Sequence, residues 1–168
     1  MKPIEKSIWQ SPIKTILLSG FIAGSLDILS AFLVYVIVLN KTTAANILKG
    51  IASGIFHAKA FTGGTMMAFC GLLFHFIIAF CFAIFYFLIY RHIPFLQKQK
   101  IINGLLYGIF VWCVMNLLVL PIVFSRPVTF KLDPFLIGAP ILMVMIGLPI
   151  SIITNKYYSL KNANKKII

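Results

Sequence analysis

Four long runs of hydrophobic residues, each free of Lys and Arg, dominate the pattern along the chain. They cover about residues 15–39, 66–90, 101–124 and 135–154. A helix rises about 1.5 Å per residue, so roughly 20 residues cross a hydrocarbon core about 30 Å thick. The runs are continuous rather than alternating, which excludes the strands of a membrane barrel. The pattern predicts an all-α fold in one integral membrane domain over residues 1–168, a polytopic bundle of four transmembrane helices.

Proline and polar residues mark the ends of these runs. Asp133 followed by Pro134 should open the fourth helix, because a carboxylate caps the first turn and proline is tolerated at the first helical position. Pro94 should end the second helix, since proline cannot continue one. Three tyrosines near the ends are predicted to place their hydroxyls among lipid headgroups: Tyr90, Tyr157 and Tyr158.

The segment between the first two runs is too polar and glycine-rich to span a membrane. Its apolar residues recur at helical spacing, at Ile47, Leu48, Ile51, Ile55 and Phe56. Polar residues fall opposite them, at Lys49, Ser53 and Lys59. This pattern predicts a short amphipathic helix at the outer membrane surface, or a re-entrant segment packed on the bundle, over about residues 44–60. Such a helix either caps the bundle or serves as a lid or gate over a cavity.

Composition and charge agree with a membrane protein and exclude a soluble globule. The chain is 61% hydrophobic and 11% charged, and 15 Lys+Arg against 3 Asp+Glu give a net charge of +12. The basic residues lie between the apolar runs rather than on a polar face, so they indicate membrane topology and not nucleic-acid binding. Ten of them fall on the side that holds both termini and residues 91–100, and five fall on the other side. Because positive residues resist translocation, both termini are predicted to face the cytoplasm.

Two ionisable residues fall inside the apolar runs, Asp27 in the first and His75 in the second. Each costs at least about 2.5 to 3.5 kcal/mol in hydrocarbon, so each needs a partner or a function. Counted along the helices, Asp27 lies about 18 Å and His75 about 14 Å from the outer end, so the two can meet. Asn116 of the third run falls at a similar depth. We therefore predict an intramembrane polar cluster of Asp27, His75 and Asn116, with Ser25 and Ser30 nearby.

Small residues share the faces of these polar side chains and predict close helix packing there. They are Gly20, Gly24, Gly71, Gly104 and Gly108. In the fourth run Pro140 and Pro149 each remove a helical hydrogen bond, so two helix kinks and irregular packing around a cavity are expected.

The cluster supports two interpretations. A carboxylate and an imidazole in a low-dielectric site can exchange a proton or coordinate a cation, which predicts a small transporter or channel-like protein. Alternatively the pair only fixes helix register, and the chain is a non-catalytic scaffold or accessory subunit. Four helices make a narrow bundle in the lipid bilayer, which favours a homo-oligomer or a larger membrane partner.

Catalysis and cofactor binding are disfavoured. Ser25, His75 and Asp27 include the residue types of a hydrolase, but no nucleophile elbow accompanies them. A zinc site needs three or four ligands and a membrane haem two facing histidines, and the runs supply neither at one depth. We therefore expect no enzyme activity, no metal and no cofactor.

Several motifs resemble the YagU-like family of small bacterial inner-membrane proteins. They are Gly20-Phe21-Ile22-Ala23-Gly24 in the first run, Phe74-His75-Phe76-Ile77-Ile78 through Phe85-Tyr86 in the second, Ile93-Pro94 in the turn, and Asn103-Gly104, Tyr107-Gly108 and Pro121 in the third. The resemblance covers roughly residues 16–154. It implies a compact helical bundle in a bacterial inner membrane and no particular activity. Asp27 is not among the matching positions.

Overall fold

The computed structural model describes residues 11–125, 127–128, 130 and 132–165, with the side chains of 133, 164 and 165 left aside. Of the described residues, 88% are helical and none lies in a strand. In chain order the elements are α2 (Pro12–Ala31), η1 (Phe32–Val38), α3 (Ala44–Phe56), α4 (Lys59–Thr62), α5 (Gly64–Tyr90), α6 (Pro94–Lys98), α7 (Lys100–Cys113), η2 (Val114–Val119), α8 (Leu120–Val123), α9 (Leu132–Leu142), η3 (Met143–Gly147) and α10 (Leu148–Lys165), where η marks a π-helix.

Four continuous helices are long and apolar enough to cross a membrane, which confirms the predicted all-α bundle. They are Pro12–Val38, Gly64–Tyr90, Lys100–Val123 and Pro134–Ala163. The first begins where the Ser11 side chain accepts a hydrogen bond from the Lys14 amide at 3.4 Å, with proline next in the chain. The predicted cap at Asp133 falls on a side chain outside the described residues.

The fourth helix continues well past residue 154, where the apolar run ends. Hydrophobicity decides where a helix can enter lipid, whereas the helix itself continues wherever the backbone and side chains permit. Tyr157 and Tyr158 extend the packing surface, since both rings contact Phe87 of α5 at centroid distances of 5.1 and 5.2 Å. A boundary drawn from hydropathy alone therefore ends the helix too early.

Three of the long helices contain π-helical segments, and two of these lie beside prolines. η2 ends just before Pro121, and η3 lies between Pro140 and Pro149. Proline has no N–H to donate to the carbonyl four residues earlier, and π-helical turns are one way in which a helix accommodates such a break. The two prolines of the fourth run thus flank a widened turn.

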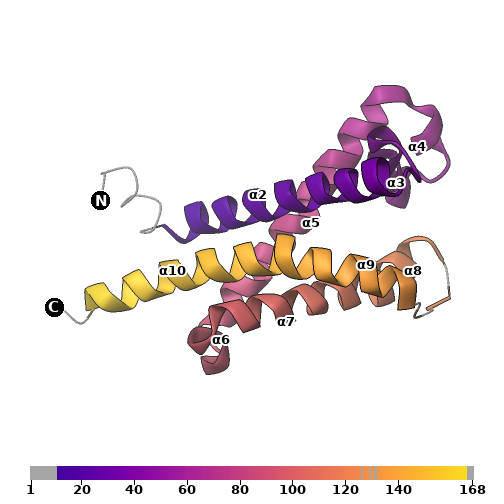
Figure 1. Ribbon diagram of the computed structural model, residues 1–168. Helices are drawn as coiled ribbons and strands as arrows, with labels where there is room; N and C mark the ends of the chain where they lie inside the picture. The colour runs from indigo at the N-terminus through magenta and orange to yellow at the C-terminus, as the bar shows by residue number, and fades with distance from the viewer. Residues whose placement is uncertain (1–10, 126, 129, 131, 166–168) are drawn as a thin grey trace.

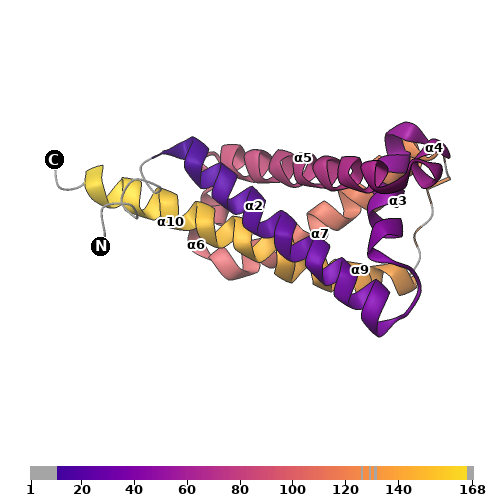
Figure 2. The same ribbon diagram turned by 90° about the horizontal axis from the view of Figure 1, so that it is seen from above.

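The helices form an elongated bundle (Figures 1 and 2). α2 packs on α5 and α10, and α7 packs on α9, η3 and α10. α5 crosses the others obliquely in Figure 1, and α2 begins at the same end of the bundle as α10 finishes. α3 and α4 lie at the opposite end, where α3 runs across the bundle in Figure 2. The first long helix therefore begins, and the fourth ends, at the same end of the bundle, as an even number of antiparallel spans requires.

Glycines set the close helix contacts. At Gly24 a Cβ atom would lie 3.0 Å from the Phe76 ring and 3.1 Å from the Cβ of Ala79, so α2 rests directly on α5. At Gly108 a Cβ would lie 2.5 Å from the backbone nitrogen of Met143, and Gly104 faces Gly147 across the same contact. Gly20 contacts the Phe80 ring of α5 in the same way as Gly24 contacts Phe76.

Gly71 has a different neighbour from the one that its stripe of small residues suggests. A Cβ there would collide with the Leu48 carbonyl, so the backbone of α3 lies against α5 at this point. Ser53, which the helical spacing places on the polar face of α3, is buried, and its hydroxyl donates to the Gly50 carbonyl at 2.7 Å. α3 therefore docks through its small residues, while Ile55 is 60% exposed.

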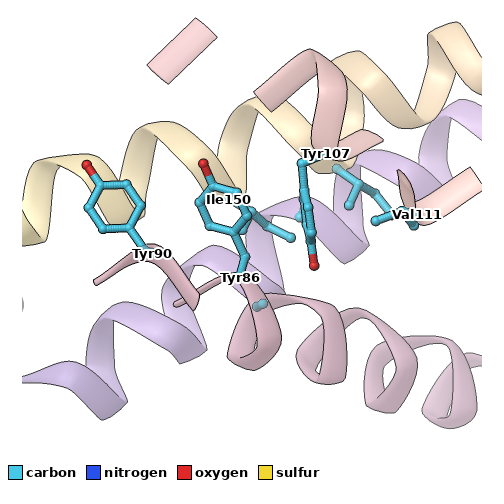
Figure 3. Packing of buried hydrophobic residues seen from close by; sticks show 8 residues of the cluster. Tyr86, Tyr90, Tyr107, Val111 and Ile150 are labelled. Atoms are coloured by element: carbon cyan, nitrogen blue, oxygen red, sulfur yellow. The ribbon is translucent and has the colours of Figure 1, made fainter. Parts of the chain in front are cut away.

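The end of the bundle away from α3 is filled by tyrosines. Figure 3 shows the rings of Tyr90, Tyr86 and Tyr107 in succession along the bundle, beside Ile150 and Val111. Their hydroxyls are not free to reach lipid headgroups. Tyr107 donates to the Phe82 carbonyl at 2.7 Å, and the Tyr90 hydroxyl accepts from the Asn155 amide at 2.7 Å.

The sequence-based placement of the end tyrosines at headgroups is wrong for two of them. Tyr90 is 2% and Tyr157 is 3% exposed, and both lie inside the aromatic cluster that also contains Phe87 and Tyr158. Both rings pack against other aromatic rings across the α5–α10 contact, and such aromatic pairs stabilise a fold beyond the effect of the area that they bury.

Candidate functional site

The two ionisable residues of the apolar runs, Asp27 and His75, border one large cavity. Its volume is about 510 Å³, which is within the range of small-molecule sites. α5 and α7 are joined by tyrosines at one end of the bundle, whereas at the other end the gap between them is bordered by α3. The cavity is lined by Asp27, Ile47, Gly50, Ile51, Gly54, Ile55, Phe74, His75, Ile78, Ala79, Phe82, Val111, Met115, Val119, Leu120, Val123, Phe124, Leu142 and Ile146.

Asp27 is partly buried and lies on the α2 face that packs against α5. No hydrogen bond to its carboxylate is recorded among the described residues, although His75 is close enough to interact with it electrostatically. Its position follows from the spacing, since Gly24 and Asp27 are three residues apart and share a helix face. Asp27 is the acidic side chain among the described residues that line the cavity.

His75 is 9% exposed and bonds to the backbone of α2 rather than to the carboxylate. Its Nε2 lies 2.8 Å from the carbonyl oxygen of Gly24. A carbonyl can only accept, so Nε2 donates, and in the neutral ring Nδ1 is left as an acceptor. The glycine makes the contact possible, because the backbone of α2 lies open to α5 where there is no side chain.

Asn116 is separated from His75. It lies in η2, its amide donates to the Trp112 carbonyl at 3.0 Å, and it borders a second cavity of about 190 Å³. Asp27 also lines this smaller cavity, together with Ala31, Tyr35, Trp112, Pro134, Gly138, Ile141 and Leu142. Only Asp27 and Leu142 are common to the two cavities. The predicted cluster is thus divided, with Asp27 between its two halves.

The two serines do not join the carboxylate. The Ser30 hydroxyl donates to the backbone carbonyl of Asp27 at 2.7 Å, a local bond within the helix. Ser25 lines neither cavity. Two residues further along a helix is about 200° around its axis, so Ser25 and Asp27 lie on nearly opposite faces.

Sequence reasoning missed the polar network at the tyrosine end. Ser151 donates to the Lys100 carbonyl at 2.7 Å, so at the 2.8 Å contact between Tyr86 and Ser151 the tyrosine is the donor. Tyr86 and Tyr90 are four residues apart on α5, as are Ser151 and Asn155 on α10. That matched spacing was the available signal, because two helices with polar residues at the same interval can pair them.

The fold and the cavities define a class: an α-helical bundle with the dimensions of a four-span membrane protein and an acid–imidazole pair beside an apolar cavity. Among the described residues no three or more His, Cys, Asp or Glu side chains gather as they would around a metal ion. No protein-family model, curated protein or solved structure matches the chain. The site's function must therefore be argued from its own geometry.

Proposed function

We propose that this chain is an integral membrane protein in which Asp27 and His75 form the working site of proton- or cation-coupled transport. The observation that carries the proposal is that Asp27 borders both cavities, the larger one with His75 and the smaller one with Asn116. A carboxylate between two spaces can exchange a proton or a cation with either, and the imidazole beside it offers a second site for the proton.

The membrane setting rests on the outer surface of the bundle. Large apolar side chains lie exposed along the long helices, such as Leu29 at 60%, Phe69 at 62% and Leu136 at 60%. Exposed apolar side chains along whole helices indicate a surface that lipid or a partner protein covers. Lys14, Arg91 and Lys161 belong to the end at which α2 begins, so positive charge collects there. The proposal places both termini in the cytoplasm of a bacterial cell and the bundle in its inner membrane, alone or as an oligomer.

The test is ion flux in proteoliposomes that carry a pH-sensitive dye. The wild-type chain should move protons when a Na⁺ or K⁺ gradient or a membrane potential is imposed, and Asp27→Asn should reduce this flux to the protein-free level. Ser25→Ala is the matched control, because it changes the same helix without bordering either cavity. The proposal is refuted if the folded wild-type protein gives no proton flux above that of protein-free liposomes under any of these gradients.

A second candidate is a scaffold or accessory subunit, and one observation favours it. The hydrogen bond from His75 to Gly24 ties α5 to α2, which is what a register-fixing residue does. In that case Asp27→Asn and His75→Gln should change stability without any flux to lose, and the protein should copurify with a larger membrane complex.

A further inference from the structure

The side chains that line the larger cavity limit the chemical classes of ligand that could bind there. Among the described side chains that line it, Asp27 and His75 are the only ionisable ones, and the others are aliphatic, aromatic or glycine, apart from the thioether of Met115. Phe74, Phe82 and Phe124 add aromatic rings to its wall. The wall thus combines one carboxylate with a large apolar surface, in a chain whose net charge is +12.

A bare inorganic cation fits this wall poorly. Ca²⁺ takes six to eight oxygen ligands and Mg²⁺ about six, and both lose their hydration shell only where the protein replaces it. Beside Asp27 the cavity offers an imidazole and no other side-chain oxygen ligand. An ion stripped of its water here would lack most of its ligands.

An organic cation with its own apolar surface matches every part of the wall. Its positive centre would lie beside the Asp27 carboxylate and near aromatic rings, whose faces attract cations. Its hydrocarbon part would be removed from water against the isoleucines of α3, Ile47, Ile51 and Ile55, and against Ile78 of α5. The cavity volume of about 510 Å³ suits a drug-sized molecule and greatly exceeds what one ion needs.

We propose that the larger cavity binds lipophilic cations, held by Asp27 under the cover of α3. This inference rests on the proposed function and names its substrate class. α3 carries part of the wall through two glycines: Gly54 lies close against Val123, whereas Gly50 leaves open space, since a Cβ there would meet nothing within 4 Å. A ligand in the cavity would be enclosed by α3, by α5 with Asp27 of α2, and by residues of the third and fourth long helices such as Met115 and Ile146.

The experiment is equilibrium dialysis of the purified full chain in mild detergent against radiolabelled tetraphenylphosphonium. Tetraphenylborate, of nearly the same size and opposite charge, is the comparison ligand. The wild-type protein should bind the phosphonium saturably, and Asp27→Asn should weaken this binding about tenfold or more, because it removes the charge that faces the cation.

A second variant tests the cavity without touching Asp27. At Gly50 a Cβ would meet nothing within 4 Å, so the side chain of Gly50→Leu fills part of the cavity without a clash at the backbone. This variant should also weaken phosphonium binding about tenfold or more. Ala45→Leu is the matched control, since Ala45 is an exposed residue of the same helix that does not line the cavity, and it should bind as the wild type does.

The inference is overturned if the folded wild-type chain does not bind the phosphonium, if Asp27→Asn binds it unchanged, or if Gly50→Leu and Ala45→Leu behave alike. The flux assay separates this inference from the proposed function. Binding that depends on Asp27 without any proton flux, including under an imposed gradient of the phosphonium itself, supports the ligand class and refutes transport. Ion flux that depends on Asp27 without phosphonium binding supports transport and refutes the ligand class.

Discussion

Substitution of Gly108 by alanine tests one of the close contacts between helix backbones in the bundle. The new Cβ would lie 2.5 Å from the Met143 nitrogen and 2.7 Å from the Leu142 carbonyl oxygen, whereas ordinary contact begins at 3.4 Å. The Met143 Cα lies closer still, and the obstacle is backbone and not the end of a flexible side chain, so α7 and η3 must separate by about 1 Å. Strain of this kind costs about 1–3 kcal/mol.

Alanine also gains about 1 kcal/mol over glycine through its helix propensity, which offsets part of that strain. We therefore expect Gly108→Ala to lower the free energy of unfolding by up to about 2 kcal/mol. Gly50→Ala is the matched control, because its Cβ meets nothing within 4 Å, and it should raise stability by about 0.5–1 kcal/mol.

The assay is unfolding of the purified chain in mixed micelles, followed by circular dichroism as the fraction of denaturing detergent increases. Both variants exchange glycine for alanine inside a helix, so a difference in sign between them can come only from what the new methyl group meets. Equal stabilisation by the two substitutions would refute the reasoning, since α7 and η3 would then be free to separate at no cost.

Two further predictions use the same unfolding assay. Tyr86→Phe should cost about 0.5–1.5 kcal/mol, because it removes one buried donor while Ser151 keeps its bond to the Lys100 carbonyl; an unchanged stability would mean that the Tyr86 hydroxyl contributes nothing. His75→Phe should cost about 1 kcal/mol or more, since the ring remains but its hydrogen bond to Gly24 is lost; a gain in stability would show that burying the imidazole costs more than this bond returns.

Most of the fold was predictable because lipid imposes simple rules on a sequence. A run of apolar residues that spans about 30 Å must be helical, and four such runs predict four helices whatever their contacts. Asp27 and His75 could be placed in the same region by counting helical rise, since both helices start from known ends. That count gives depth along a helix, and the spacing from Gly24 gives the face.

The division of the polar cluster could not be predicted in this way. Depth along a helix does not say which of two cavities a side chain borders, and Asn116 borders the smaller cavity whereas His75 borders the larger one. The π-helical turn that contains Asn116 also rotates it from the face expected for an ideal α-helix. A widened turn arises from the local balance of proline, packing and backbone bonds, which hydropathy does not record.

The burial of the end tyrosines shows a second limit. Tyrosines near the ends of membrane helices, such as Tyr90 and Tyr157, are typical of an aromatic belt. A single sequence does not distinguish a tyrosine at the membrane interface from one that is packed inside the bundle. Their burial depends on α10 continuing beyond the apolar run, so that Asn155 reaches the Tyr90 hydroxyl. An error in one helix boundary therefore became an error in the role of two residues.

The two ends of the bundle differ in how far they admit a ligand: one is filled by side chains and the other borders a cavity. At one end Tyr86 and Tyr107 fill the space between the helices, and their hydroxyls are bonded to Ser151 and to the Phe82 carbonyl. At the other end α3 borders a cavity that reaches Asp27. A ligand that enters beside α3 would thus meet the carboxylate before it meets the tyrosines. Passage beyond Asp27 then requires the α5–α10 contact to open, whereas an accessory role requires it to stay closed.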